Sequence, residues 1–178
     1  MSESGPLLTT ERLELWRPRA ADAPELYALV APEAMRRFLG GPTTEGEEFL
    51  RFLRNAGSWE LYGYGMFLLR ERGRAPLVGI AGVFRSWRAF GKGMADVPEA
   101  GWITAGGSGG QGYATEAMRA ALAWFDRSFT EPRTVCMIED GNAPSMAVAA
   151  RLGFVEYDRH EPEDARALVL YERIVAPG

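Results

Sequence analysis

The sequence predicts an α+β protein with a mixed, mostly antiparallel central sheet of about six to seven strands, flanked by helices. Hydrophobic residues alternate with period two in several short segments and recur at helical spacing in others. Some of the expected strands follow one another directly, as in hairpins, whereas others are separated by a helix, as in β-α-β crossovers. A sheet with both kinds of connection is neither purely parallel nor purely antiparallel.

Composition favours one domain over residues 1–178, because 47% hydrophobic residues in 178 positions suffice for a full core. The net charge of -4 and the scattered basic residues argue against nucleic acid or an anionic membrane as a partner. The one cysteine, Cys136, excludes an internal disulfide or a thiolate metal cluster, and no metal is expected. Because residues 1–10 contain no apolar run, we expect a cytoplasmic protein.

The first third of the chain predicts one strand followed by two or three short helices. Leu13 and Leu15 alternate with polar neighbours, and Pro18 ends this strand. A short helical segment is expected over residues 32–39, before a pair of glycines.

Two of these helices carry capping-box patterns, in which a polar residue is followed by an acid three positions later. Asp22 with Glu25 predicts the start of the first helix, and Thr44 with Glu47 predicts the start of a later one. Gly57 is the expected end of the later helix.

From residue 65 onward the pattern becomes that of strands and crossovers. The expected elements up to the glycine turn are a hairpin of 66–70 with 77–84, a loop over 87–98 and a strand at 101–104. After the turn we expect a long amphipathic helix from residue 112 onward, a strand at 135–138 and a helix at 142–152. A hairpin of 154–157 with 168–174 closes the chain.

The glycine-rich turn over residues 106–112 is the strongest candidate for a functional site. It connects a short apolar strand to a helix N-terminus, where unpaired backbone N–H groups and the helix dipole favour an anion. Gly107, Gly109 and Gly112 fit the dinucleotide pattern G-x-G-x-x-G, while the G-x-S-x-G pattern around Ser108 fits the nucleophile elbow of hydrolases. A flexible surface loop is the simplest alternative.

Both motifs fit their context poorly. The dinucleotide pattern belongs after the first strand of a doubly wound fold, whereas this turn lies past the middle of the chain. A hydrolase based on Ser108 would need His160, the one histidine, as its base, and three further loop residues separate Ser108 from the helix. The acids available to orient that histidine are Asp126, Asp140 and Asp158.

A third interpretation of the turn comes from two separate segments. The stretch 110–117 (GQGYATEA) resembles the pyrophosphate turn of the GNAT superfamily of N-acetyltransferases, and N-x-x-S at 142–145 followed by LGF at 152–154 resembles its downstream segment. Together with the opening 8–15 (LTTERLEL), these letters are similar to the RimJ/RimL-like branch, which acetylates ribosomal-protein N-termini. Gly109 departs from the Arg or Gln that the superfamily often has at that position.

The resemblance implies an acyl-CoA N-acyltransferase fold with acetyl-CoA as co-substrate. The residues that it implicates in holding the cofactor are Trp102, Ile103, Thr104, Gly110, Gln111, Gly112, Tyr113, Ala114, Thr115 and Asn142. Gly112 is needed where a side chain would collide with the pyrophosphate. The alternative structural role of Asn142 is that of a helix N-cap.

The resemblance also implies direct attack of an amine on acetyl-CoA in a ternary complex. It points to Glu99 as general base and to Ser145 as the group that hydrogen-bonds or protonates the leaving thiolate, with Glu163 and Asp164 as rival bases. The expected acceptor is a peptide or protein N-terminal α-amine. A small-molecule amine, or a CoA-binding module without activity, is the alternative, and a homodimer is possible.

Overall fold

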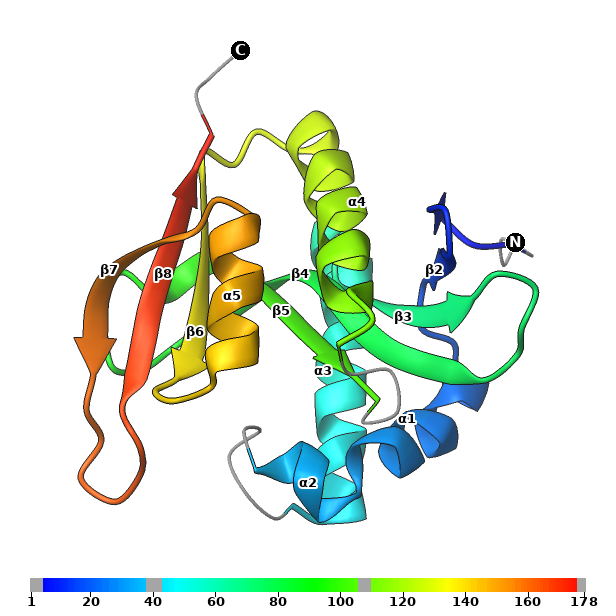
Figure 1. Ribbon diagram of the computed structural model, residues 1–178, viewed down its shortest axis with the longest axis horizontal. Helices are drawn as coiled ribbons and strands as arrows, with labels where there is room; N and C mark the ends of the chain where they lie inside the picture. The colour runs from blue at the N-terminus through cyan, green and yellow to red at the C-terminus, as the bar shows by residue number, and fades with distance from the viewer. Residues whose placement is uncertain (1–4, 38–42, 106–109, 176–178) are drawn as a thin grey trace.

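The computed structural model describes residues 5–37, 43–105 and 110–175. Its centre is a mixed, mostly antiparallel sheet of eight strands in the order β1-β2-β3-β4-β5-β6-β8-β7, and the one parallel pair is β5 with β6 (Figure 1). The strands are β1 (Leu8–Thr9), β2 (Leu13–Trp16), β3 (Met66–Glu71), β4 (Leu77–Trp87), β5 (Ala95–Thr104), β6 (Arg133–Glu139), β7 (Val155–His160) and β8 (Leu168–Ile174). The predicted fold class is therefore confirmed.

The helices fall into two groups along the chain. A 3-10 turn, η1, and three helices separate β2 from β3, while α4 and α5 follow β5 and β6. Their bounds are η1 (Ala20–Asp22), α1 (Ala23–Val30), α2 (Glu33–Arg36), α3 (Glu45–Tyr62), α4 (Tyr113–Ser128) and α5 (Ala143–Arg151). No helix of the described residues is long and apolar enough to cross a membrane.

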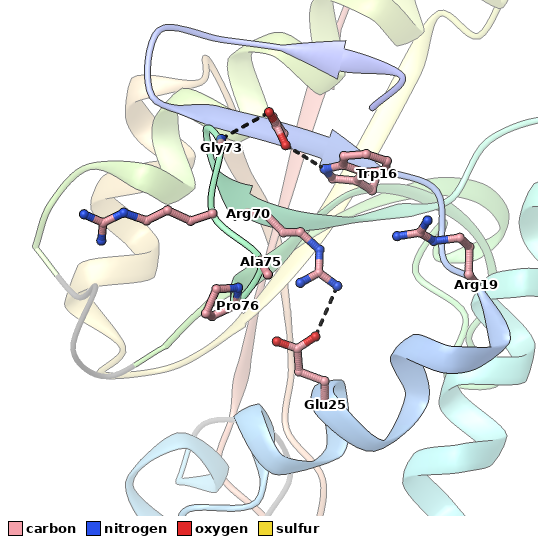
Figure 2. A pocket seen from close by; sticks show the side chains of 9 residues that line it. Trp16, Arg19, Glu25, Arg70, Gly73, Ala75 and Pro76 are labelled. Carbon is pink, nitrogen blue, oxygen red and sulfur yellow. Dashed lines mark hydrogen bonds and ion pairs between the residues drawn. The ribbon is translucent and has the colours of Figure 1, made fainter. Parts of the chain in front are cut away.

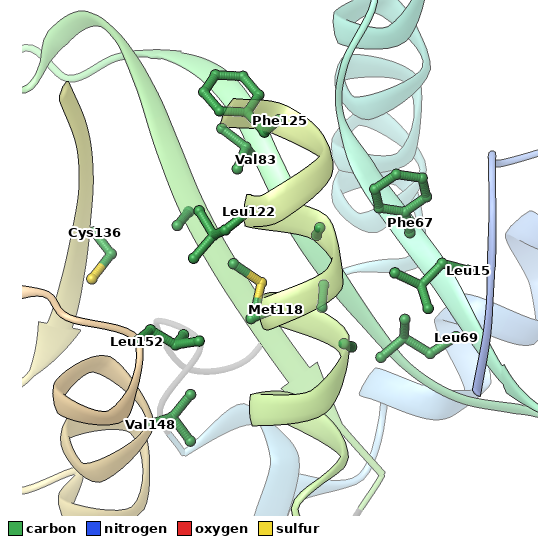
Figure 3. Close-up of a cluster of buried hydrophobic side chains, with 14 of the residues drawn as sticks. Leu15, Phe67, Leu69, Val83, Met118, Leu122, Phe125, Cys136, Val148 and Leu152 are labelled. Atoms are coloured by element: carbon green, nitrogen blue, oxygen red, sulfur yellow. The ribbon is translucent and has the colours of Figure 1, made fainter. Parts of the chain in front are cut away.

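The main hydrophobic core joins the sheet to α4 and α5 (Figure 3). Met118, Leu122 and Phe125 of α4 are buried in it, at the spacing of one helix face. Alternation along the strands sends neighbouring residues to opposite faces, so Phe67 belongs to this core while Leu68 packs in a second cluster with residues of α1. Both faces of the sheet are therefore covered.

The predicted loop over 87–98 is wrong. Strand β4 continues to Trp87 and pairs with β5, which begins at Ala95, so the connection shrinks to residues 88–94. The ends of these strands are largely exposed, and their side chains lack the apolar alternation that marks a half-buried strand. Backbone pairing with β4 determines the structure of this segment, and the sequence pattern does not show it.

One boundary prediction for the helices is also wrong, and a second is right in position but not in its side-chain contact. Helix α3 passes through Gly57 and ends at Gly63, whose left-handed φ of 78° is the conformation that favours glycine after a helix. Asp22 is the N-cap residue of α1, as predicted, but its carboxylate does not cap the helix; it accepts hydrogen bonds from the Arg19 backbone and from Arg70 instead.

The second capping box is confirmed. The hydroxyl of Thr44 accepts a hydrogen bond from the Glu47 backbone N–H, and the Glu47 carboxylate accepts one from the Thr44 backbone N–H. These two hydrogen bonds fix the start of α3.

Candidate functional site

Strands β5 and β6 separate just before the glycine turn. Their ladder contains a single parallel pair, Glu99 with Val135, although β5 continues for five residues beyond Glu99. Ala105 donates its backbone N–H to Val78 on the β4 side. Since backbone groups along a strand alternate in direction, the N–H and C=O of Trp102 and Thr104 point toward the β6 side, where no strand of the described residues pairs with them. A ligand with amide groups can pair there as an extra strand does.

The glycine turn leads directly into the N-terminus of α4. Within the described part of the turn, Gly110 and Gly112 have φ values of 83° and 78°. Residues with a side chain rarely adopt this left-handed backbone conformation. Gly112 is the N-cap of α4, and no side chain among the described residues caps this end of the helix. The first-turn N–H groups therefore remain available to a bound anion. Ser108, with the rest of 106–109, lies outside the described residues.

A surface cavity of about 800 Å³ opens beside this helix end. Its lining comes from the β1–β2 turn, the glycine turn, α4 and the end of α5: Thr10, Glu11, Arg12, Gly110, Gln111, Gly112, Thr115, Glu116, Arg119, Ala120 and Arg151. Arg119 and Arg151 are exposed, and within the described parts of the chain neither has an ion-pair or hydrogen-bond partner. Two uncompensated cations beside a helix N-terminus make the cavity suited to phosphate groups.

Arg12 anchors the glycine turn to the β1–β2 turn. Its Nη1 donates to the Gln111 carbonyl at 2.8 Å, and its Nε donates to the Glu116 carboxylate at 2.7 Å. Thr10 Oγ1 donates to the same carboxylate at 2.6 Å. The Arg12 guanidinium also lies 4.7 Å from the centre of the Tyr113 ring.

The contact with the Gln111 carbonyl orients one peptide group of the turn. In a trans peptide the carbonyl and the following N–H point in opposite directions. Because Arg12 holds the Gln111 oxygen, the Gly112 N–H points away from Arg12.

Arg12 also compensates the charge of Glu116 in the first turn of α4. Burial by itself would raise the pKa of Glu116, but hydrogen bonds from Thr10 and Arg12 outweigh it and lower the pKa. The carboxylate is therefore ionised and paired at neutral pH, so its charge is not left free near the cavity.

The residues predicted for the cofactor separate into two kinds. Gly110, Gln111 and Gly112 line the cavity, and so does Thr115. Tyr113, in contrast, is buried and donates its hydroxyl to Glu71 of β3 at 2.7 Å, so its side chain anchors α4 to the sheet.

Other predicted cofactor residues also take part in the core. Trp102 and Ala114 pack against the main core, while Ile103 packs against the second cluster. Trp102 can still offer its backbone to a ligand, whereas the backbone of Ile103 faces β4.

Asn142 and Ser145 lie together at the start of α5. The Asn142 side chain is the N-cap and accepts the Ser145 backbone N–H at 3.3 Å, with Pro144 in the first turn. The structural role considered for Asn142 is therefore present. Ser145 is half-buried in the first turn after β6.

Glu99 is buried and held by an arginine. Only 3% of Glu99 is exposed, and its two carboxylate oxygens accept hydrogen bonds from Arg88 at 2.6 and 2.9 Å. The pair sits where β5 and β6 separate, because Glu99 is the residue of their single pairing. Arg88 was not anticipated from the sequence, since it lies in the segment expected to be a loop.

The alternative bases and the hydrolase residues lie elsewhere. Glu163 and Asp164 are in the exposed connection between β7 and β8. His160 stacks on Phe90, with ring centres 4.1 Å apart. The three acids considered as its orienters pair with arginines or lysine instead: Asp126 with Arg173, Asp140 with Arg159 and Asp158 with Lys92. The structure therefore gives the hydrolase hypothesis no support.

A second cavity, of about 540 Å³, lies between β2, α1 and the β3–β4 turn (Figure 2). Its polar groups are engaged with one another: Arg70 pairs with Glu25, and the Glu14 carboxylate accepts from Trp16 and the Gly73 N–H. We assign it no ligand. No cluster of His, Cys, Asp or Glu among the described residues could hold a metal ion.

The separating strands, the helix N-terminus and the two arginines form a site suited to a phosphate-bearing ligand with an extended arm. The chain matches the family described as "Acetyltransferase (GNAT) domain" over residues 12–155. It belongs to this family and is an acetyl-CoA-dependent N-acetyltransferase. A search of the curated proteins gave no significant match.

Solved structures agree with this assignment. A GnaT-family acetyltransferase from Bordetella pertussis is 36% identical, with a TM-score of 0.83 over 93% of this chain and 98% of that one. An acetyltransferase from Agrobacterium tumefaciens is 26% identical, with a TM-score of 0.80 over 97% and 96%. A Salmonella typhimurium enzyme that modifies the N-terminal serine of ribosomal protein L7/L12 shares the fold at 20% identity, with a TM-score of 0.74 over 94% and 97%.

Proposed function

We propose that the enzyme binds acetyl-CoA across the glycine turn and the gap between β5 and β6. The backbone N–H groups of residues 111–115 would hold the pyrophosphate, and Arg119 and Arg151 would contact the phosphates. The pantetheine arm would pair with the backbone of Trp102 and Thr104. The observation that carries this proposal is the loss of β5–β6 pairing immediately before an uncapped helix N-terminus.

The proposed reaction is direct attack by the amine nitrogen on the thioester carbonyl. The C–N bond forms, the C–S bond breaks, and the amine loses a proton to a base while the thiolate of CoA takes one up. Ser145, at the start of α5, is proposed to hydrogen-bond or protonate that thiolate. Glu99 is proposed as the base, through water, and this role requires the hydrogen bonds from Arg88 to loosen.

The arginine pairing of Glu99 favours an acceptor that needs little help in losing its proton. At pH 7 an unperturbed lysine costs about 4.6 kcal/mol to deprotonate, whereas an α-amino group costs about 1 kcal/mol. We therefore propose a peptide or protein N-terminal α-amine as acceptor. Resemblance to the RimJ/RimL-like branch supports the same choice.

A matched peptide panel tests the acceptor. Short peptides with a free N-terminus should be acetylated faster than the same sequences with a blocked N-terminus and one free lysine. Equal or reversed rates would refute the α-amine preference. Acetylation of small amines alone would replace the acceptor class and leave the cofactor site standing.

Steady-state kinetics test the base. Glu99→Gln should lower kcat at least about tenfold, because general bases usually contribute 10²- to 10⁴-fold. Glu163→Gln and Asp164→Asn are matched exposed controls and should stay near wild-type turnover. If one of these controls loses activity and Glu99→Gln does not, the base is in the β7–β8 connection.

A further inference from the structure

Helix α3 has a second apolar stripe on the side turned away from the protein. The buried residues of α3 include Phe52, Asn55 and Trp59, which lie on the inward side of the helix. Leu50 and Leu53 lie roughly opposite, and they are 61% and 46% exposed. A surface helix ordinarily presents polar residues on that side, so an apolar stripe there indicates a covering partner.

Two glycines continue this stripe at both ends. Gly46 and Gly57 lie in the same outward direction as Leu50 and Leu53, at the spacing 46-50-53-57. A Cβ at Gly57 would meet no atom within 4 Å, and one at Gly46 would meet only the Thr44 hydroxyl at 4.0 Å. Glycine is disfavoured inside helices, and no contact of the described chain requires it here. Close approach of a second helix would require it.

The spacing is symmetric when the helix is reversed. Turning α3 end for end about the midpoint between Leu50 and Leu53 exchanges these two residues with each other, and likewise exchanges Gly46 with Gly57. A two-fold antiparallel dimer would therefore place Leu50 beside Leu53 of the partner subunit, with a glycine facing a glycine on either side. We propose that the outward stripe of α3 is the surface on which a second copy of this chain docks.

Charges beside the stripe fit the same arrangement. Arg54 has no hydrogen-bond or ion-pair partner among the residues that the structure describes. Glu47 lies on the same flank of the stripe, and the cap at Thr44 uses only its Oε2 atom. In the antiparallel dimer Arg54 comes within about one turn of Glu47 of the partner subunit, so two ion pairs form by symmetry.

Sedimentation velocity of the full chain over a range of concentrations tests the proposal. Wild type should dimerise, and Leu50→Glu should raise the dimer dissociation constant at least tenfold, since each dimer loses two apolar contacts and gains two carboxylates. Val155→Glu is the matched control, because Val155 is an apolar residue 66% exposed on β7, away from α3. A wild type that stays monomeric, or a dimer that Leu50→Glu leaves intact, overturns the proposal.

A second variant separates docking from folding. Gly57→Leu should raise the melting temperature of the monomer, measured at a concentration where wild type is monomeric, because leucine favours the helix and meets no neighbour. The same variant should weaken dimerisation, because its side chains separate the two helices. A stable variant that dimerises like wild type contradicts the close approach.

Disulfide trapping tests the orientation. Native Cys136 is 1% exposed and will not interfere. A mixture of Gly46→Cys and Gly57→Cys chains should cross-link under mild oxidation, whereas either variant alone should not, because equal positions in the antiparallel pair lie about 16 Å apart along the axis. Cross-linking of each variant alone, without the mixed product, would indicate a parallel pair and overturn the proposal.

Discussion

Gly112 combines two requirements at one residue. Its φ of 78° is a left-handed conformation, and its N–H is part of the proposed pyrophosphate site. A Cβ there would lie 3.6 Å from Arg12 Nη2, which is ordinary contact. In the free protein, backbone strain is therefore the main cost of a side chain at this position.

Gly112→Ala should lower the free energy of unfolding by about 1–2 kcal/mol, the cost of a left-handed non-glycine residue, and should also weaken acetyl-CoA binding. Urea denaturation and a binding titration measure the two effects. Gly141→Ala is the matched control, because Gly141 has φ 86°, has open space around it and does not line the cavity. It should show the strain alone. Equal binding losses in both variants would contradict a role for Gly112 in the site.

Arg12→Ala should weaken acetyl-CoA binding several-fold, because the turn loses its anchor and Glu116 regains an uncompensated charge beside the phosphates. Adding Glu116→Gln should restore part of the affinity if charge compensation matters. Arg127→Ala, which removes an exposed arginine at the other end of α4, should leave binding unchanged. Isothermal titration of the four proteins measures the coupling, and an Arg12→Ala variant with wild-type affinity would refute the anchor.

Glu116 should also make stability depend on pH. Its pKa is lowered below 4.5 on folding, so its contribution is complete above pH 4.5 and is lost as the pH falls through the folded-state pKa. The difference in unfolding free energy between wild type and Glu116→Gln should therefore shrink below pH 4.5. A difference that stays constant from pH 6 to pH 3 would contradict the pairing.

At the level of elements, the separation of β5 and β6 creates the proposed arm-binding groove. The two strands are parallel and meet at one residue pair, while each keeps a full antiparallel partner on its other side. The sheet therefore stays continuous, while on one side the backbone near Trp102 pairs with no strand of the part of the chain that the structure describes.

Hydrogen exchange should report this gap. In the free enzyme the amides of Trp102 and Thr104 should exchange faster than that of Ile103, whose backbone faces β4. Acetyl-CoA should slow Trp102 and Thr104. Equal protection of all three amides without ligand would mean that the gap is closed in solution.

At the level of the whole molecule, the proposed cofactor site draws on segments far apart in the chain. The β1–β2 turn, the glycine turn and the end of α5 line one cavity. A ligand that binds there connects these segments, and it stabilises the native state alone, because unfolding disperses the site.

Acetyl-CoA should therefore raise the melting temperature, with a gain of about 2.7 kcal/mol in unfolding free energy at one hundred times its dissociation constant. NADH at the same concentration should have no effect, since the turn is not at the switch point of a doubly wound sheet. Differential scanning calorimetry measures both. Stabilisation by NADH and not by acetyl-CoA would refute the cofactor assignment.

The sequence by itself determined the fold class and the family, and it pointed to the glycine turn that we propose as the cofactor site. These depend on local patterns: alternation in the strands, a helical stripe in α4, the capping box at Thr44 and the glycines that accept positive φ. Such features depend on each residue and its near neighbours, so a single sequence reveals them.

Only the tertiary structure decided how distant side chains combine. Glu99 lies eleven residues from Arg88, and Arg12 lies more than one hundred from Glu116, yet each pair forms a close ion pair. Whether a carboxylate is a free base or a bound partner depends on which strands and turns the fold places side by side. Non-local packing sets that neighbourhood, and no local sequence pattern encodes it.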